Sequence, residues 1–152
     1  MTSDRDAVEL QLGRPPRAFR RVVVRCPFGR PAVTEQAAYD ENGEPFPTTF
    51  WLTCPHLVSA VSRLEAAGGV ERWSRAAATD PELGASLERA NNEQRRVRPE
   101  LDLGVGGARA GAGSLKCLHA HIAFALARPG YELGERIVAE LEPLWPGVCC
   151  TP

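Results

Sequence analysis

The spacing of hydrophobic residues changes once along the chain, after Cys54. Before that point, residues 20–25, 32–39 and 48–53 are short runs rich in β-branched and aromatic residues, separated by turn clusters. The second turn contains an Asn-Gly pair at residues 42–43, which is a strong hairpin signal. We therefore predict three antiparallel strands that follow one another in chain order.

Beyond Cys54 the hydrophobic positions recur at helical spacing. Leu57, Val61 and Leu64 lie on one face of a helix that is expected to end at Gly68. The whole pattern predicts an α+β fold, in which a small three-stranded antiparallel sheet in the N-terminal half is covered by four or five helices. Further helices are predicted over residues 70–78, 81–98, 115–127 and 133–144. The chain is expected to consist of an N-terminal arm (1–19), a single domain (20–145) and a flexible tail (146–152).

Composition and charge then narrow the class of protein. The chain has 152 residues, of which 43% are hydrophobic and 24% charged, as is typical of one globular domain. The formal net charge of −1 gives no overall field that would hold nucleic acid or an anionic membrane, so neither is expected as a partner. The sequence shows neither a long apolar run nor a signal peptide, and we expect a cytoplasmic protein.

The cysteines and histidines are the candidate chemistry. Cys26 and Cys54 end the first and third predicted strands, which run in the same direction, and Cys117 opens a predicted helix, so we expect these sulfurs to meet. His121 shares a helical face with Cys117, whereas His119 joins it only if the helix starts late. Thiolate and imidazole groups are the usual ligands of zinc. The predicted metal ligands are therefore Cys26, Cys54, Cys117, His119 and His121, and zinc is the expected ion.

Two other interpretations of these residues remain open. In the first, Cys117 is the nucleophile of a thiol-dependent enzyme or redox protein, with His119 as acid and base. Lys116, the one lysine of the chain, would then favour the thiolate. In the second, the cysteines are small hydrophobic residues and the histidines are ordinary helix residues. Whether the protein is an enzyme is therefore left open.

Several short motifs stand in a fixed order along the chain. They include Arg25-Cys26-Pro27, Pro45-Phe46-Pro47-Thr48, Leu52-Thr53-Cys54-Pro55, Ser62-Arg63-Leu64-Glu65 and Lys116-Cys117-Leu118-His119. Together they resemble the uncharacterised actinobacterial family known as domain of unknown function 501, over about residues 12–137.

This resemblance implies a small cytosolic bacterial protein with no assigned activity, commonly encoded near enolase and a septum-formation protein. It also implies that Cys26 and residues 116–119 are motif positions, and that the motif ends at His119. The partners stay unknown. We expect a binding or accessory module with a Cys/His metal site, with the thiol-dependent enzyme as the alternative.

Overall fold

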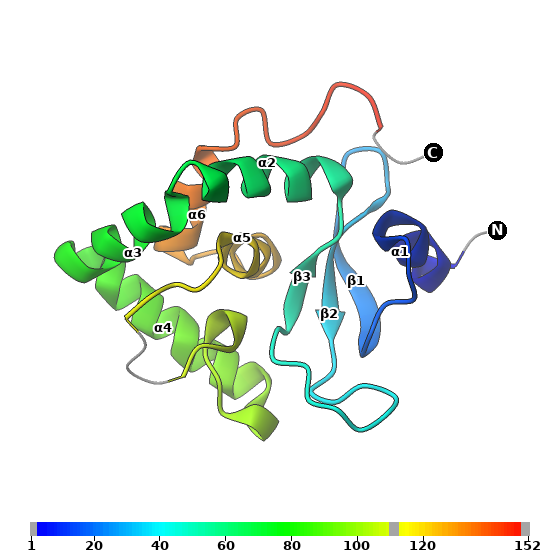
Figure 1. Ribbon diagram of the computed structural model, residues 1–152, viewed down its shortest axis with the longest axis horizontal. Coiled ribbons are helices and arrows are strands. Elements are labelled where there is room, and N and C mark those ends of the chain that lie inside the picture. The colour runs from blue at the N-terminus through cyan, green and yellow to red at the C-terminus, as the bar shows by residue number, and fades with distance from the viewer. Residues whose placement is uncertain (1–2, 110–112, 150–152) are drawn as a thin grey trace.

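A three-stranded antiparallel sheet occupies the N-terminal half of the protein, as predicted. The computed structural model describes residues 3–109 and 113–149. Strands β1 (Phe19–Arg25), β2 (Pro31–Gln36) and β3 (Phe50–Leu52) lie in the order β1-β2-β3 (Figure 1). Strand β3 is therefore an edge strand.

The helices lie on both sides of this sheet, which confirms the α+β class. Helix α1 (Asp4–Leu12) packs against β1 and β2 on one side, and the later helices gather on the side of β3 (Figure 1). These later helices are α2 (Pro55–Ala66), α3 (Gly69–Thr79), α4 (Pro81–Val97), α5 (Leu118–Ala127) and α6 (Glu132–Ala139), with short 3-10 helices η1 (Pro99–Leu101) and η2 (Val105–Gly107).

Helix α5 is the central helix of the core. Its residues Leu118 and Ile122 are fully buried, and Phe124 meets Phe50 of β3 edge to face, with ring centroids 5.7 Å apart. The start of α5 lies so close to the start of α3 that a Cβ atom at Gly69 would come within 2.9 Å of a Leu118 methyl group. This close packing fixes the N-terminus of α5 beside α2 and β3.

Two predicted helix boundaries are wrong. The helix expected over residues 115–127 begins only at Leu118, because Lys116 has a left-handed backbone (φ 70°) and Cys117 an extended one. Cys117 is therefore the N-cap of α5 and does not lie in its first turn. The helix expected over residues 133–144 ends at Ala139, before Pro143, a residue that a helix interior does not accommodate.

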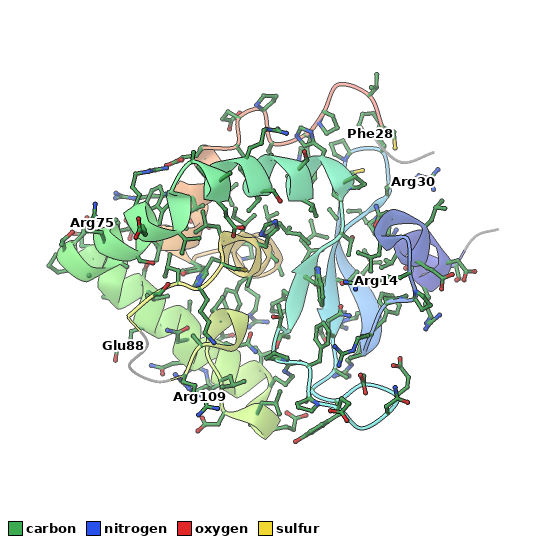
Figure 2. All side chains as sticks on the ribbon, viewed as in Figure 1. Arg14, Phe28, Arg30, Arg75, Glu88 and Arg109 are labelled. Carbon is green, nitrogen blue, oxygen red and sulfur yellow. The ribbon has the colours of Figure 1, made fainter. Side chains whose placement is uncertain are left out.

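Many charged side chains lie on the surface around this core. Charged side chains such as Arg75, Glu88 and Arg109 are exposed at the periphery (Figure 2). Within the two described ranges, no helix combines the length and the apolar character that crossing a bilayer requires.

Candidate functional site

Three chemically reactive side chains meet where the start of α5 approaches α2. Cys117 and His119 come from the start of α5, and Glu65 comes from the last turn of α2. The Cys117 Sγ, a ring nitrogen of His119 and a carboxylate oxygen of Glu65 all lie within 4.8 Å of one another. We call these three residues the Cys-His-Glu cluster. Among the residues that the structure describes, it is the one group of this kind.

The local backbone builds the cluster by capping α5 with side chains. The Cys117 Sγ accepts the N–H of Ala120 (3.4 Å), and Glu65 Oε2 accepts the N–H of Leu118 (2.7 Å). These N–H groups belong to the first turn of α5, which has no helical carbonyl to offer them. Both caps also bring negative charge or electron-rich atoms to the positive end of the helix dipole, where they are stabilised.

His119 is held from three sides. Its Nδ1 lies 3.2 Å from Glu65 Oε2 and its Nε2 lies 3.3 Å from the Ser62 hydroxyl oxygen. Because the carboxylate can only accept, Nδ1 donates to it. A hydrogen bond with Cys117 raises the pKa of His119 above its ordinary value, desolvation opposes this, and the negative charge of Glu65 adds to it. The cluster therefore favours a proton on this imidazole.

A pocket of about 350 Å³ opens beside the cluster. Cys117 and His119 line it, whereas Glu65 and Ser62 do not. The sulfur and the imidazole thus face the pocket, and the carboxylate contacts the ring outside it. The remaining walls are mostly apolar and come from Thr48, Phe50, Trp51, Leu52, Val58 and Ala120.

Cys26 and Cys54 are not part of the cluster. Both are buried, Cys26 in the turn after β1 and Cys54 as the N-cap of α2. Glu65 lies near the opposite end of α2, about 16 Å from Cys54 along the helix axis at the usual rise of about 1.5 Å per residue. The predicted meeting of Cys26, Cys54 and Cys117 in one group is therefore not found, because Cys117 joins the far end of α2.

His121 lies in the core, away from the cluster. Its Nδ1 accepts the hydroxyl of Tyr131 (2.7 Å) and its Nε2 donates to the Leu115 carbonyl (3.1 Å). Burial lowers the pKa of His121 to about 4, so the ring is neutral near pH 7. Because α5 starts at Leu118, Cys117 lacks the helical conformation on which the predicted pairing with His121 depended.

Lys116 also lies outside the cluster. It is exposed, and its Nζ is 3.5 Å from the carbonyl oxygen of Gly107. Its contribution is its left-handed backbone, which turns the chain just before Cys117.

Glu65 and Ser62 are the residues that sequence reasoning missed. Both stand in the motif Ser62-Arg63-Leu64-Glu65, but that motif gave them no chemical role. Their spacing of three residues places them on one face of a helix. That spacing was the one signal in the sequence that linked these two residues. It could not show that they contact His119, because His119 is more than fifty residues away in sequence.

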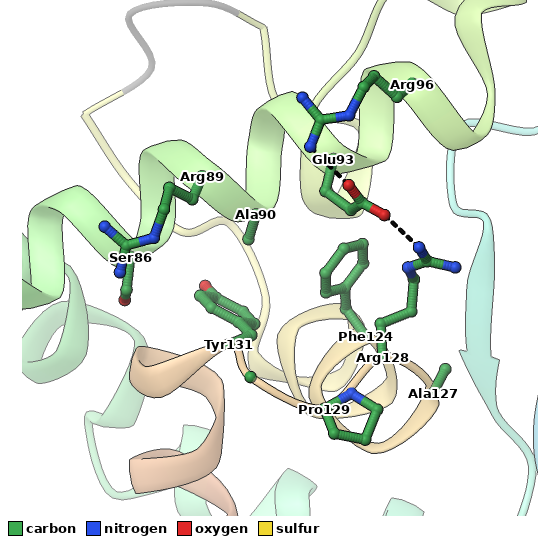
Figure 3. A pocket seen from close by; sticks show the side chains of 11 residues that line it. Ser86, Arg89, Ala90, Glu93, Arg96, Phe124, Ala127, Arg128, Pro129 and Tyr131 are labelled. Carbon is green, nitrogen blue, oxygen red and sulfur yellow. Dashed lines mark hydrogen bonds and ion pairs between the residues drawn. The ribbon is translucent and has the colours of Figure 1, made fainter.

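A second pocket, of about 450 Å³, lies between α4 and the end of α5 (Figure 3). Arg96 and Arg128 both donate to the carboxylate of Glu93, and these hydrogen bonds lower the pKa of Glu93. The pair between Arg128 and Glu93 joins the end of α5 to α4, and the pair between Arg96 and Glu93 lies within α4, so both arginines have a structural role. The chemistry of the protein is therefore better sought at the Cys-His-Glu cluster.

Comparisons with known proteins place the chain in a family. Neither the curated proteins nor the solved structures gave a match. The family model described as "Protein of unknown function (DUF501)" matches residues 22–102, which is more than half of the chain. The matched region includes Glu65, while Cys117 and His119 lie beyond it. The predicted family is thus confirmed: the chain belongs to the DUF501 family, whose function is unknown.

Proposed function

We propose that the protein is a thiol-dependent enzyme with Cys117 as nucleophile and His119 as general base. The observation that supports this most directly is the division of roles around the pocket. The sulfur and the imidazole face the cavity, and Glu65, outside it, accepts from the His119 Nδ1. Nucleophile, base and a third group that orients the base form the usual arrangement for activating a thiol.

In this mechanism His119 takes the thiol proton of Cys117, and the thiolate attacks an electrophilic carbon of a substrate in the pocket. Glu65 is a positioning residue, which fixes the ring orientation and stabilises the imidazolium. The N-terminus of α5 stabilises the negative sulfur, since Sγ already accepts the N–H of Ala120 there. His119 then returns the proton to the leaving group.

A zinc site in a binding or accessory module is the second candidate. Its support is the convergence of three groups that suit zinc: carboxylate, thiolate and imidazole. Three protein ligands and one open position are also the pattern of a catalytic zinc. However, the carboxylate oxygen that would bind zinc is already used in hydrogen bonds, because Glu65 Oε2 accepts from the Leu118 N–H and from the His119 ring.

Alkylation by iodoacetamide, followed by mass spectrometry of the peptides, tests the thiol proposal. We expect Cys117 to be modified at neutral pH about tenfold faster in the natural protein than in His119→Gln, because less thiolate forms without the base. The matched control is His56→Gln, which removes a half-buried histidine that contacts the Pro143 carbonyl instead of the cluster. Equal rates in all three proteins would overturn the proposal.

Elemental analysis of the same samples tests the zinc candidate. One zinc per chain that is lost in both Cys117→Ser and His119→Gln, together with faster alkylation after chelation, would favour zinc over the thiol proposal. A metal-free protein with a rapidly alkylated Cys117 would favour the enzyme.

A further inference from the structure

The walls of the pocket beside Cys117 carry no fixed charge. Apart from Cys117 and His119, the lining residues are Thr48, Phe50, Trp51, Leu52, Val58 and Ala120. Among the described residues that line this pocket, none is an arginine, a lysine, an aspartate or a glutamate. A substrate that reaches the sulfur through the pocket therefore meets apolar side chains and one neutral hydroxyl.

The part of the wall that a substrate can contact is mainly Trp51 and Val58. Phe50 and Leu52 are only 5% and 1% exposed, because α5 packs against β3, so they close the pocket toward the core. Trp51 and Val58 are half-buried and present more surface. The Trp51 ring is stacked on Phe46, with ring centroids 4.8 Å apart, which holds it in place. The accessible wall is thus apolar and fixed by packing.

The reactive groups supply no spare cation for an anionic substrate. In the state with a thiolate at Cys117, the protonated His119 already faces two negative groups, this thiolate and the carboxylate of Glu65. Lys116 does not line the pocket, and its Nζ lies 3.5 Å from the Gly107 carbonyl oxygen. A carboxylate or phosphate that loses its water without gaining a cation pays a large cost in free energy. The pocket therefore selects against anionic acyl groups.

An uncharged apolar group is favoured by the same walls. When it covers Trp51 and Val58, water leaves both surfaces, and this burial of apolar area stabilises the complex. A cationic group would lose its hydration against the same side chains, and no carboxylate lines the pocket to replace it. The volume of about 350 Å³ is near the lower end of the usual range for ligand pockets, which indicates a small group.

We propose that the substrate of Cys117 carries a small, uncharged, apolar acyl group, which occupies the pocket and places its carbonyl carbon at the sulfur. This inference rests on the proposed function, whose substrate class it names. The sulfur forms a bond to the carbonyl carbon, the bond to the leaving group breaks, and the leaving group takes the proton that His119 removed from the thiol. Water then attacks the thioester and gives a proton to His119, which returns it to the sulfur as the S–C bond breaks. One water molecule is consumed, and no electron donor or acceptor is needed.

Three p-nitrophenyl esters with acyl chains of similar length test the substrate class. The probes are the hexanoate, the adipate monoester, whose chain ends in a carboxylate, and the trimethylammonio-hexanoate, whose chain ends in a cation. Release of p-nitrophenolate gives the rate, and mass spectrometry of the peptides locates the acyl group on Cys117. Each rate is divided by the rate of N-acetylcysteine with the same ester, which removes differences in intrinsic reactivity. We expect the corrected rate of the hexanoate to exceed those of both charged esters by at least about tenfold. A smaller preference, or a faster charged ester, would overturn the inference.

Val58→Arg tests whether the pocket wall makes this selection. An arginine at this lining position adds a cation for the adipate chain, so the preference for hexanoate over adipate should fall at least about fivefold. The matched control is Ser59→Arg, which adds the same charge at the next residue of α2, an exposed position outside the pocket lining. This control should keep the preference of the natural protein. Equal preferences in the two variants would overturn the inference.

Circular dichroism checks that each variant is folded. If Val58→Arg is not, Thr48→Arg makes the same test from the half-buried lining residue that precedes β3. The two proposals fail separately. If iodoacetamide reacts at Cys117 in a His119-dependent way but the hexanoate is not preferred, only the substrate inference falls. A Cys117 that is inert toward iodoacetamide overturns the enzyme and, with it, the substrate inference.

Discussion

The position of the reactive sulfur depends on the backbone of one residue, Lys116. Its left-handed conformation ends the loop and delays the start of α5 to Leu118. The delay makes Cys117 an N-cap and brings His119, two residues later, to the same carboxylate that caps the helix. At this scale the charge of Lys116 matters less than its backbone, since its ammonium is exposed and reaches only a loop carbonyl.

Replacing Lys116 by Met tests this distinction. We expect the rate at which iodoacetamide alkylates Cys117 to change less than about twofold, because exposed charges are screened and contribute little. In contrast, Glu65→Gln should slow the reaction about fivefold or more, because the ring of His119 loses its ionic partner. If Lys116→Met slows alkylation as much as Glu65→Gln does, the ammonium supports the thiolate after all.

The buried His121 predicts a pH dependence of stability. Its pKa is about 4 in the folded protein and about 6.5 in an unfolded chain, so the unfolded state binds a proton first as the pH falls. The neutral ring therefore contributes to the free energy of unfolding in full above about pH 6.5, and this contribution is lost as the pH falls to about 4. Its upper limit is about 3 kcal/mol.

Denaturant titrations between pH 4 and pH 7 measure this effect. The free energy of unfolding of His121→Gln should fall less over this range than that of the natural protein, because glutamine can donate to the Leu115 carbonyl but does not titrate. His56→Gln is the control for a histidine outside the core. Parallel curves for the natural protein and His121→Gln would show that His121 is not the group responsible.

At the scale of elements, the N-terminus of α5 joins structure and chemistry in one side chain. The Cys117 Sγ is both the cap of α5 and the proposed nucleophile. Serine is a preferred N-cap residue, whereas alanine provides no acceptor. The two roles can therefore be separated by substitution.

We expect Cys117→Ser to unfold at or above the temperature of the natural protein, and to resist alkylation at this position. Cys117→Ala should lower the free energy of unfolding by about 1 kcal/mol relative to Cys117→Ser, because the N–H of Ala120 loses its acceptor. Thermal unfolding followed by circular dichroism measures both values. Equal stability of the two variants would mean that the contact between Sγ and Ala120 does not cap the helix.

At the scale of the molecule, two of the helices that build the core, α5 and α6, lie outside the region that the family model matches. Leu118 and Ile122 of α5, with Leu133 and Ile137 of α6, are fully buried, yet the match ends at residue 102. Burying each such side chain contributes about 1.5 to 3 kcal/mol. Four of them supply about 6 to 12 kcal/mol, which is comparable to the whole stability of a domain, about 5 to 15 kcal/mol.

A fragment of residues 1–109 should therefore not fold. We expect it to show no cooperative thermal transition and poor dispersion in its amide NMR spectrum, whereas the full chain shows both features of a folded protein. Adding a peptide of residues 110–152 should restore folding in part, because it carries α5 and α6. A cooperative transition in the fragment alone would show that the sheet and α2 to α4 form an independent core.

The sequence by itself determined the local structure and the family. The β-branched runs, the turn at residues 42–43 and the helical spacing of Leu57 and Val61 are local signals, and the corresponding strands and helix are present. Cys117 and His119 also stood out, because reactive residue types are visible in a sequence wherever they lie. The motif order identified the family, which the family model confirms.

Only the tertiary structure decided which residues share a site. Glu65 and Cys117 are more than fifty residues apart, and no local pattern says that the end of α2 meets the start of α5. That meeting follows from the packing of Leu118 against Gly69 and from one left-handed residue, Lys116. The start of α5 lies three residues later than predicted, so Cys117 precedes the helix and does not share a helical face with the residue four positions later. For this reason His119 and Glu65 lie beside Cys117, whereas His121 turns into the core.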